Sequence, residues 1–182
     1  MVGLFCKFKL QKVIVMDLSV RKTMRLQNYN YSENGAYYVT ICTKNKAKVL
    51  GQVVGYGACD IPFTKLSTCG KIVEKHITLM NNKYDYLSID KYVIMPNHIH
   101  LLISITSDNN VSVCRKPPNP TNELIPKFVS LFKRYCNLEY GQQIWQRSYY
   151  DHIIRDEKDY LTKWNYIDGN PSKWENDDYY IK

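Results

Sequence analysis

The stretch from Tyr92 to Ile103, which reads Tyr-Val-Ile-Met-Pro-Asn-His-Ile-His-Leu-Leu-Ile, constrains the fold more than any other part of the chain. It reads as two apolar strands joined at Met95-Pro96-Asn97, because Asn suits a turn and Pro cannot donate to a sheet ladder. Side chains on a strand alternate between faces, so His98 and His100 share one face of the second strand. The apolar flanks predict that this strand is central and buried, where two imidazoles need partners.

We interpret the two histidines as half of a metal site. A bare His-x-His has a high false-positive risk, and the same pattern is typical of a polar stripe on a half-exposed sheet. A metal site needs at least one more ligand and an open position. The last predicted helix offers Tyr166 and Asn170, which are four residues apart and share one helical face. The structural alternative is that Tyr166 packs in the core and Asn170 caps the helix before Pro171.

Hydrophobic periodicity and turn residues divide the rest of the chain into strands and helices. Strands are expected over residues 36–43, 49–54, 87–95 and 98–105, with a strand or extended segment over 144–150. Helices are expected over 68–81, 124–139 and 157–168. This order predicts an α+β fold, ferredoxin-like, with helices packed on a mostly antiparallel sheet. Residues 1–20 are an N-terminal extension of unclear structure, and residues 21–182 are expected to form a single catalytic domain.

The chain of 182 residues has 25 Lys and Arg against 17 Asp and Glu, a formal charge of +8. That balance favours a polyanionic partner such as nucleic acid, although a merely basic, solvated surface gives the same count. Candidate DNA-binding residues are Arg21, Lys22, Arg25, Lys133, Arg134, Arg147 and Arg155. Asp151 and His152 are candidates for orienting the metal ligands, or for a local salt link.

Six scattered cysteines without a Cys-x-x-Cys pair indicate reduced thiols in a cytoplasmic protein. No apolar run approaches 18 residues, so no membrane span is expected.

The run from Tyr92 to Ile103 resembles the HUH motif of the single-tyrosine transposases that handle single-stranded DNA. The later runs from Ile144 to Arg155 and from Asn165 to Pro171 resemble the REP-associated branch of that family. The similarity spans about Arg21 to Trp174, nearly the whole chain.

The resemblance implies that His98 and His100 hold a divalent metal, Mn²⁺ or Mg²⁺, with Asn170 as the third ligand and Tyr166 as the nucleophile. Family members cut single-stranded DNA near hairpins or palindromic repeats, form a 5′-phosphotyrosine link and rejoin the strand elsewhere. Some act as monomers and others as dimers that share active sites, so a homodimer is compatible with the resemblance.

Two other functions fit the same sequence. One is a domesticated relative that binds hairpin DNA without cutting it, and the other is an RNA-processing or general metal nuclease that forms no covalent adduct. By composition alone, Tyr149 and Tyr150 are rival nucleophiles.

Overall fold

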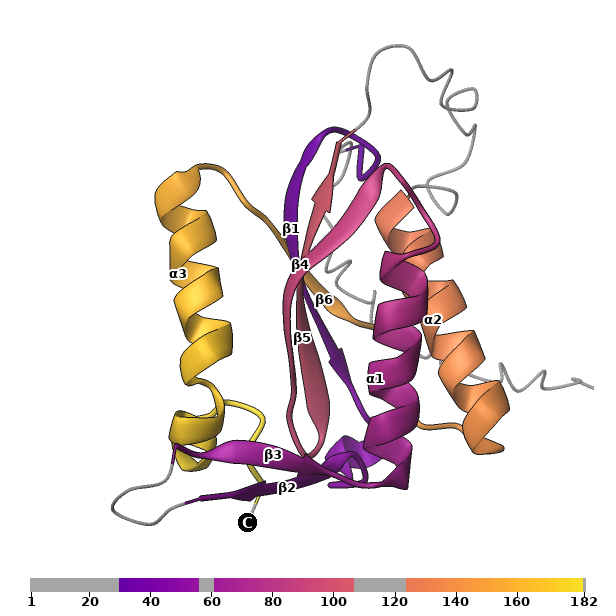
Figure 1. The fold of residues 1–182 in the computed structure, drawn as a ribbon, viewed down its shortest axis with the longest axis vertical. Coiled ribbons are helices and arrows are strands. Elements are labelled where there is room, and N and C mark those ends of the chain that lie inside the picture. The colour runs from indigo at the N-terminus through magenta and orange to yellow at the C-terminus, as the bar shows by residue number, and fades with distance from the viewer. Residues whose placement is uncertain (1–29, 56–60, 107–123, 182) are drawn as a thin grey trace, which may run out of the picture.

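The computed structural model describes residues 30–55, 61–106 and 124–181. Its centre is a four-stranded antiparallel sheet, drawn in Figure 1, with the strand order β4-β5-β1-β6. The strands are β1 (Gly35–Cys42), β4 (Leu87–Ile94), β5 (His98–Ile105) and β6 (Tyr150–Ile153). With the helices between them, this order is the ferredoxin-like arrangement, so the predicted fold class is confirmed.

The two faces of the sheet differ because the side chains of its strands alternate. On one face, Val39, Ile41, Ile99, Leu101 and Ile103 are all fully buried in the main hydrophobic core. On the other face lie Tyr38, Thr40, His98, His100 and Leu102, which the β1–β5 register places side by side. The chain therefore keeps one sheet face for its core and gives the other face polar side chains.

Two helices cover the apolar face. These are α1 (Thr68–Asn81) and α2 (Leu124–Tyr140), which lie side by side on the right of Figure 1. Both helices are amphipathic, and their apolar side chains lie in the core, among them Val73, Ile77, Phe128 and Phe132. The predicted bounds of α1 are confirmed, and Ser67 caps it by accepting a hydrogen bond from the Gly70 N–H at 3.1 Å.

The third helix, α3 (Glu157–Gly169), lies on the opposite face of the sheet. Of its residues, all of which the structure describes, Ile167 alone is buried, and it packs on Tyr38 and Leu102. A register shift in β4 between Ile89 and Lys91 leaves Asp90 as an extra residue in the strand. Such a β-bulge re-aims side chains.

Polar contacts hold α3 to the sheet. From the bulged part of β4, the Asp90 carboxylate accepts the Tyr160 hydroxyl at 3.0 Å, and Lys91 pairs with Asp168 at 2.6 Å. From β6, His152 contacts Asp159 at 2.8 Å. These contacts add to the apolar packing of α3, in which the partly buried Tyr160 and Trp164 join Ile167.

The structure gives sharper bounds for two of the predicted strands. The segment expected over 144–150 forms only an isolated bridge between Trp145 and Thr43, and the strand β6 begins at Tyr150. The strand expected over 49–54 is β2 (Gly51–Val54), and it pairs with β3 (Phe63–Leu66), which was not predicted. Short 3₁₀ helices, η1 (Lys44–Lys46) and η3 (Pro171–Asn176), complete the described elements.

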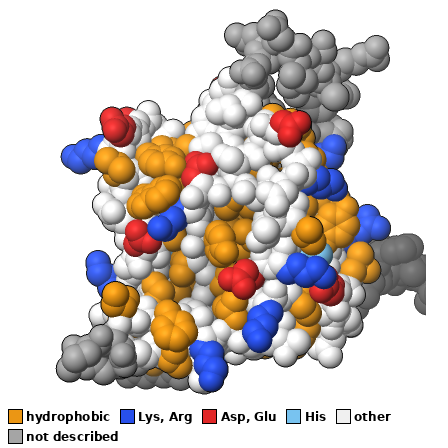
Figure 2. Space-filling view, viewed as in Figure 1, with side chains coloured by type: hydrophobic (Ala, Val, Ile, Leu, Met, Phe, Trp, Pro, Cys, Tyr) orange, Lys and Arg blue, Asp and Glu red, His pale blue; other side chains and the backbone are white. Residues whose placement is uncertain are grey.

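The surface drawn in Figure 2 mixes basic and acidic side chains, so the positive charge forms no single patch on this face. Among residues 30–55, 61–106 and 124–181, no helix has the length and apolar character that a membrane span requires.

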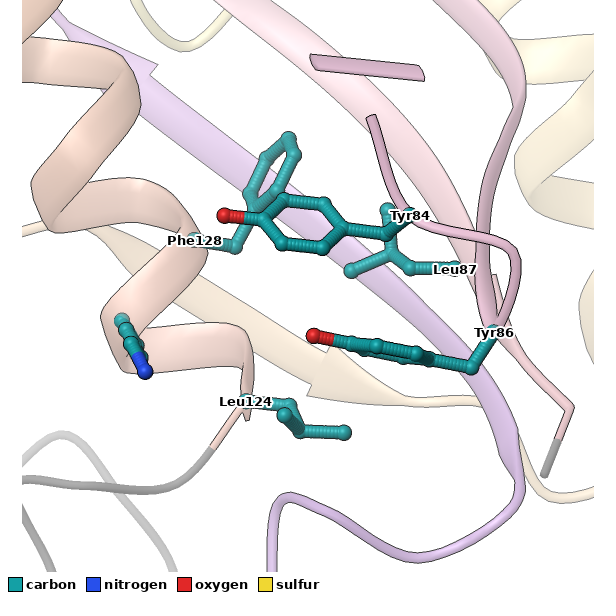
Figure 3. A pocket seen from close by; sticks show the side chains of 6 residues that line it. Tyr84, Tyr86, Leu87, Leu124 and Phe128 are labelled. Carbon is teal, nitrogen blue, oxygen red and sulfur yellow. The ribbon is translucent and has the colours of Figure 1, made fainter. Parts of the chain in front are cut away.

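Figure 3 shows a small cavity between the start of α2 and the start of β4. Its lining residues are Tyr84, Tyr86, Leu87, Leu124, Lys127 and Phe128. Its volume of about 20 Å³ accommodates little more than one water molecule, far too little for a nucleotide.

Candidate functional site

The two histidines predicted as metal ligands lie side by side at the start of β5. His98 and His100 are 0% and 1% exposed, and their Nε2 atoms are 3.0 Å apart. Burial lowers the pKa of both imidazoles below the ordinary value, and their mutual proximity lowers that of His100 further. Both rings are therefore neutral at neutral pH, which is the state in which an imidazole binds a metal.

Asn97 fixes which nitrogen of His98 carries the proton. The Asn97 side-chain N–H donates to the carbonyl of Tyr179 at 2.8 Å, so the Asn97 Oδ1 is the atom that faces His98 Nδ1, also at 2.8 Å. An amide oxygen only accepts, so His98 Nδ1 must be the protonated nitrogen. The lone pair of His98 is then on Nε2, which points at His100.

Two hydroxyl groups contact the other imidazole at its outer nitrogen. Tyr38 Oη lies 2.7 Å and Thr40 Oγ1 lies 2.8 Å from His100 Nδ1. Each hydroxyl either donates or accepts, so it can accept from His100 Nδ1–H and leave the Nε2 lone pair for a ligand. Partners of this kind orient the histidines of metal sites and increase their basicity as ligands.

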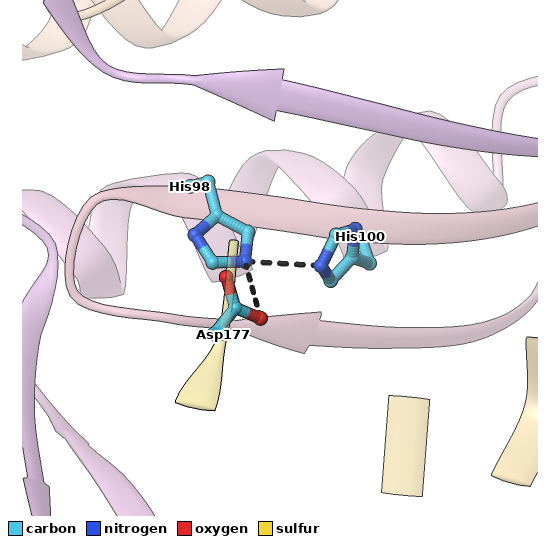
Figure 4. Close-up of side chains that lie close together, drawn as sticks. All are labelled: His98, His100 and Asp177. Carbon is cyan, nitrogen blue, oxygen red and sulfur yellow. Dashed lines mark hydrogen bonds and ion pairs between the residues drawn. The ribbon is translucent and has the colours of Figure 1, made fainter. Parts of the chain in front are cut away.

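A carboxylate that the sequence analysis missed completes the cluster. Asp177 follows η3, and Figure 4 shows its Oδ2 beside the imidazoles, 4.0 Å from His98 Nε2. The same oxygen accepts the Tyr166 hydroxyl and the Asn170 side-chain N–H, both at 3.1 Å. Its other oxygen accepts the Tyr179 N–H at 2.7 Å. The ligand atoms of His98, His100 and Asp177 all lie within 4.8 Å of one another, a spacing that suits one metal ion.

The structure brings the predicted pair on α3 to this cluster. The Tyr166 ring centroid lies 5.3 Å from that of His100, and the side chain is 40% exposed. Burial, followed by the charge of Asp177, raises the pKa of Tyr166, so the phenol is protonated at rest. Asn170 is 3% exposed and also caps α3 through its backbone N–H, so the alternative interpretation as a cap holds as well.

The Asn170 amide shows that the cluster fits a metal. A carboxylate only accepts, so the Asn170 nitrogen must face Asp177 and its Oδ1 must point away from it. That Oδ1 is buried and, among the described residues, has no hydrogen-bond partner. A buried acceptor without a partner is costly unless a ligand supplies one. His98, His100 and Asp177 themselves offer two imidazole nitrogens and one carboxylate oxygen, a donor set that suits a divalent metal.

The predicted DNA contacts are scattered over the molecule. Arg21, Lys22 and Arg25 lie outside the described residues, as does the extension 1–20. Arg134, Arg147 and Arg155 are exposed, and Arg134 is on α2, behind the sheet face that carries the imidazoles.

Lys133 is placed differently from a free surface cation. Its ammonium donates to the carbonyls of Gln146 at 2.9 Å and Ser148 at 2.8 Å, with that of Arg147 at 3.4 Å. It therefore holds the loop before β6.

The two residues predicted to orient the metal ligands lie apart from the imidazoles. Asp151 pairs with Val39 in the β1–β6 register and so faces the core side of the sheet, away from His98 and His100. His152 pairs with Tyr38 and faces α3, where it binds Asp159. Its effect on the site is indirect, through the helix that carries Tyr166.

Comparisons with known proteins identify similar sequences and a similar fold. No family model matches the chain. A Haemophilus influenzae protein named "Uncharacterized protein" is 34% identical over 175 residues, covering 88% of this chain and 93% of that protein. A second protein of that organism, named "Putative REP-associated tyrosine transposase", is 35% identical over 83 residues, or 44% of this chain and 47% of that protein.

The fold is shared with a solved structure. It is the structure of a REP-associated tyrosine transposase bound to a REP hairpin, with a TM-score of 0.56 and 19% identity, covering 82% of this chain and 73% of that one. The convergence of a His-x-His strand with a helix bearing Tyr and Asn, on a fold and a sequence shared with these relatives, leads to one conclusion. The chain belongs to one family with the Haemophilus influenzae protein that it matches over nearly its whole length, and it is similar in part of its sequence and in its fold to REP-associated tyrosine transposases.

Proposed function

We propose that the chain cuts and rejoins single-stranded DNA, with Tyr166 as the nucleophile and with a divalent metal at His98 and His100. One observation carries this proposal: the Tyr166 hydroxyl and the Asn170 amide bind the same Asp177 oxygen, which lies 4.0 Å from His98 Nε2. A nucleophile and a metal-ligand set thus share one carboxylate.

His98 Nε2, His100 Nε2 and Asn170 Oδ1 would hold the metal, with Asp177 Oδ2 beside them. Mixed nitrogen and oxygen donors suit Mn²⁺, and Mg²⁺ prefers the oxygen donors. When bound, the metal supplies Lewis-acid neutralisation of charge on a non-bridging phosphate oxygen.

The reaction exchanges one phosphodiester bond for another. The Tyr166 oxygen attacks the phosphorus, the bond to the 3′ oxygen breaks, and a 5′-phosphotyrosine link forms. The phenol proton leaves toward Asp177 Oδ2, which already accepts its hydrogen bond at 3.1 Å, and the departing 3′ oxygen takes a proton from water. The new ester conserves the bond energy, so a 3′-hydroxyl is able to reverse the step and rejoin the strand.

The proposed substrate is single-stranded DNA that carries a hairpin. The relative of known structure is described as bound to a REP hairpin, and the present chain has a net charge of +8, which suits a polyanion. Tyr166 reaches the histidines of its own chain, so the proposed reaction needs no residue from a second copy. A homodimer is compatible with the proposal but is not required by it.

A 3′-labelled hairpin oligonucleotide with single-stranded flanks, incubated with Mn²⁺, tests the proposal. The label should enter a protein adduct that survives denaturation, and a 5′-labelled copy should release a fragment that a polymerase extends from its 3′-hydroxyl. Tyr166→Phe and chelation should abolish both products. Tyr140→Phe is a matched control, because Tyr140 is 36% exposed and Tyr166 is 40% exposed.

Each other outcome points to a different function. An adduct that persists in Tyr166→Phe but is lost in Tyr150→Phe would assign the nucleophile to Tyr150, which is exposed and pairs with Thr40 beside the site. Hairpin binding without any product would favour the non-catalytic DNA-binding protein. Products without an adduct would favour a hydrolytic nuclease.

A further inference from the structure

Lys163 lies on the same face of α3 as Tyr166 and Asn170. It lies three residues before Tyr166 and seven before Asn170, a spacing that places all three side chains on one side of the helix. At a rise of about 1.5 Å per residue, Lys163 is about 4.5 Å from Tyr166 along the axis. The sequence analysis did not single it out, because a lysine on an amphipathic helix is ordinarily solvated.

The Lys163 ammonium lies over a ring of the site. Its Nζ is 5.1 Å from the centroid of Tyr38, whose hydroxyl contacts His100 Nδ1. The charge of Lys163 also contributes to the lowered pKa of His100, after burial and the charge of His98. The cation is thus close enough to influence the imidazoles electrostatically.

A second lysine occupies the equivalent position at the other end of the histidine pair. Lys46 Nζ lies 5.4 Å from the ring centroid of Tyr179, which is itself 4.7 Å from the His98 ring. The β1–β5 register aligns Cys42 with His98, while Tyr38 lies four residues away on the same face, or roughly 13 Å along the strand. One lysine therefore flanks each end of the imidazole pair.

Among the described residues, neither lysine has an ion-pair partner, and the Lys46 ammonium donates only a long hydrogen bond of 3.5 Å to the Asp178 carbonyl. Two other lysines of this fold are paired. Lys75 pairs with Glu139 and Lys91 pairs with Asp168. Within the described part of the chain, no carboxylate lies within 4.0 Å of either the Lys46 or the Lys163 ammonium. A cation over a ring is held more weakly than one hydrogen-bonded to a phosphate oxygen, so a phosphate is able to draw both ammonium groups away from the rings.

We propose that Lys163 and Lys46 bind two backbone phosphates of the substrate strand, one on each side of the phosphate at the histidine pair. This inference rests on the proposed function and adds the groups that position the strand. With a phosphate anchored at each end, the phosphorus between them is held in line with the Tyr166 oxygen. Lys163 and Lys46 thus act on the strand, not on the metal.

Binding is measured in the Tyr166→Phe background, so that no cleavage intervenes, with the same flanked hairpin over a range of salt concentrations. Each lost single-strand phosphate contact should reduce the slope of log affinity against log salt by about 0.7. Lys163→Met and Lys46→Met should each show that reduction, the double variant should show both, and Lys163→Arg should keep the original slope. Lys158→Met, exposed on the same helix, is the matched control and should match the parent.

Single methylphosphonate linkages then locate the contacts. A neutral linkage at one position should weaken the parent protein but not Lys163→Met, and a linkage at a different position should behave likewise for Lys46→Met. Unchanged slopes, or methylphosphonate effects that persist undiminished in both variants, would overturn the inference. Failure of the parent to bind the hairpin at all would instead refute the proposed function.

Discussion

Removal of one hydroxyl group, in Tyr160→Phe, should loosen α3 without disturbing the rest of the fold. The Tyr160 hydroxyl donates to the Asp90 carboxylate at 3.0 Å, and burial together with this bond raises the pKa of Tyr160 to about 12, so it remains a donor at neutral pH. Hydrogen bonds to charged groups contribute about 1.5–3 kcal/mol. Asp90 keeps two other donors, Ser88 and Ser104, so the lower figure of about 1.5 kcal/mol applies.

That free energy corresponds to about a tenfold increase in the open population of α3, because about 1.4 kcal/mol is a factor of ten. Since Ile167 is the one buried residue of this fully described helix, α3 should open separately from the core. Hydrogen exchange measured by mass spectrometry should show α3 peptides exchanging about tenfold faster in Tyr160→Phe, with α1 and α2 unchanged. Tyr140→Phe is the control.

Unchanged exchange in α3, or equal acceleration in α1 and α2, would refute this reasoning. Adduct formation should slow in the same variant, because the loosened helix carries Tyr166 and ends at Asn170.

Three further predictions concern the metal site and the core. Asn170→Leu should lower Mn²⁺ affinity at least tenfold by calorimetry, since it removes a predicted ligand, whereas exposed Asn165→Leu should not. With a chelator present, urea unfolding should show that the free energy of unfolding falls as the pH drops below about 6.5. The decrease should be up to about 1.4 kcal/mol per pH unit for each site histidine. The sign follows because burial depresses the folded-state pKa, so the unfolded chain binds more protons, and replacing both histidines by Gln should flatten the profile. Gly70→Ala should destabilise by about 2 kcal/mol or more, because its Cβ would lie 2.0 Å from the Leu50 carbonyl oxygen, while Gly169→Ala, with open space around it, should be neutral or stabilising by thermal unfolding.

Periodicity, caps and turn residues predicted those helices and strands whose formation depends on residues close in sequence. The bounds of α1 follow from its 3.6-residue periodicity and from Ser67 as N-cap. The strands around Pro96 follow from their apolar runs and the turn between them. Over residues 144–150 the sequence left a strand and an extended segment open, and the regular strand begins only at Tyr150. Lys133 donates to the carbonyls of residues 146–148, which are acceptors that a strand would use.

The spacing of residues in the sequence predicted which site residues share a face of a strand or helix. It did not predict how the strand pair and the helix pair come together in one site. His98 and His100 share a face by strand alternation, and Tyr166 and Asn170 by helical repeat. Asp177 had no such signal, because it follows a 3₁₀ helix in a segment without periodicity and reaches the histidines only through the path of the chain. The roles of Asn97, Tyr38 and Thr40 likewise depend on cross-strand contacts that no local pattern reveals.

The extra residue in β4 has a consequence for any change in the length of this strand. Before it, Leu87 and Ile89 face the core side of the sheet, and after it Tyr92 and Ile94 do so, although Tyr92 is exposed. Asp90 and Lys91 both reach α3. Deleting the Asp90 codon would restore strict alternation and leave both halves of the strand on their present faces, but it would remove the carboxylate that accepts the Tyr160 hydroxyl. An insertion of one amino acid therefore allows an otherwise apolar ribbon to present an acid and a base as neighbours to the helix that carries the proposed nucleophile.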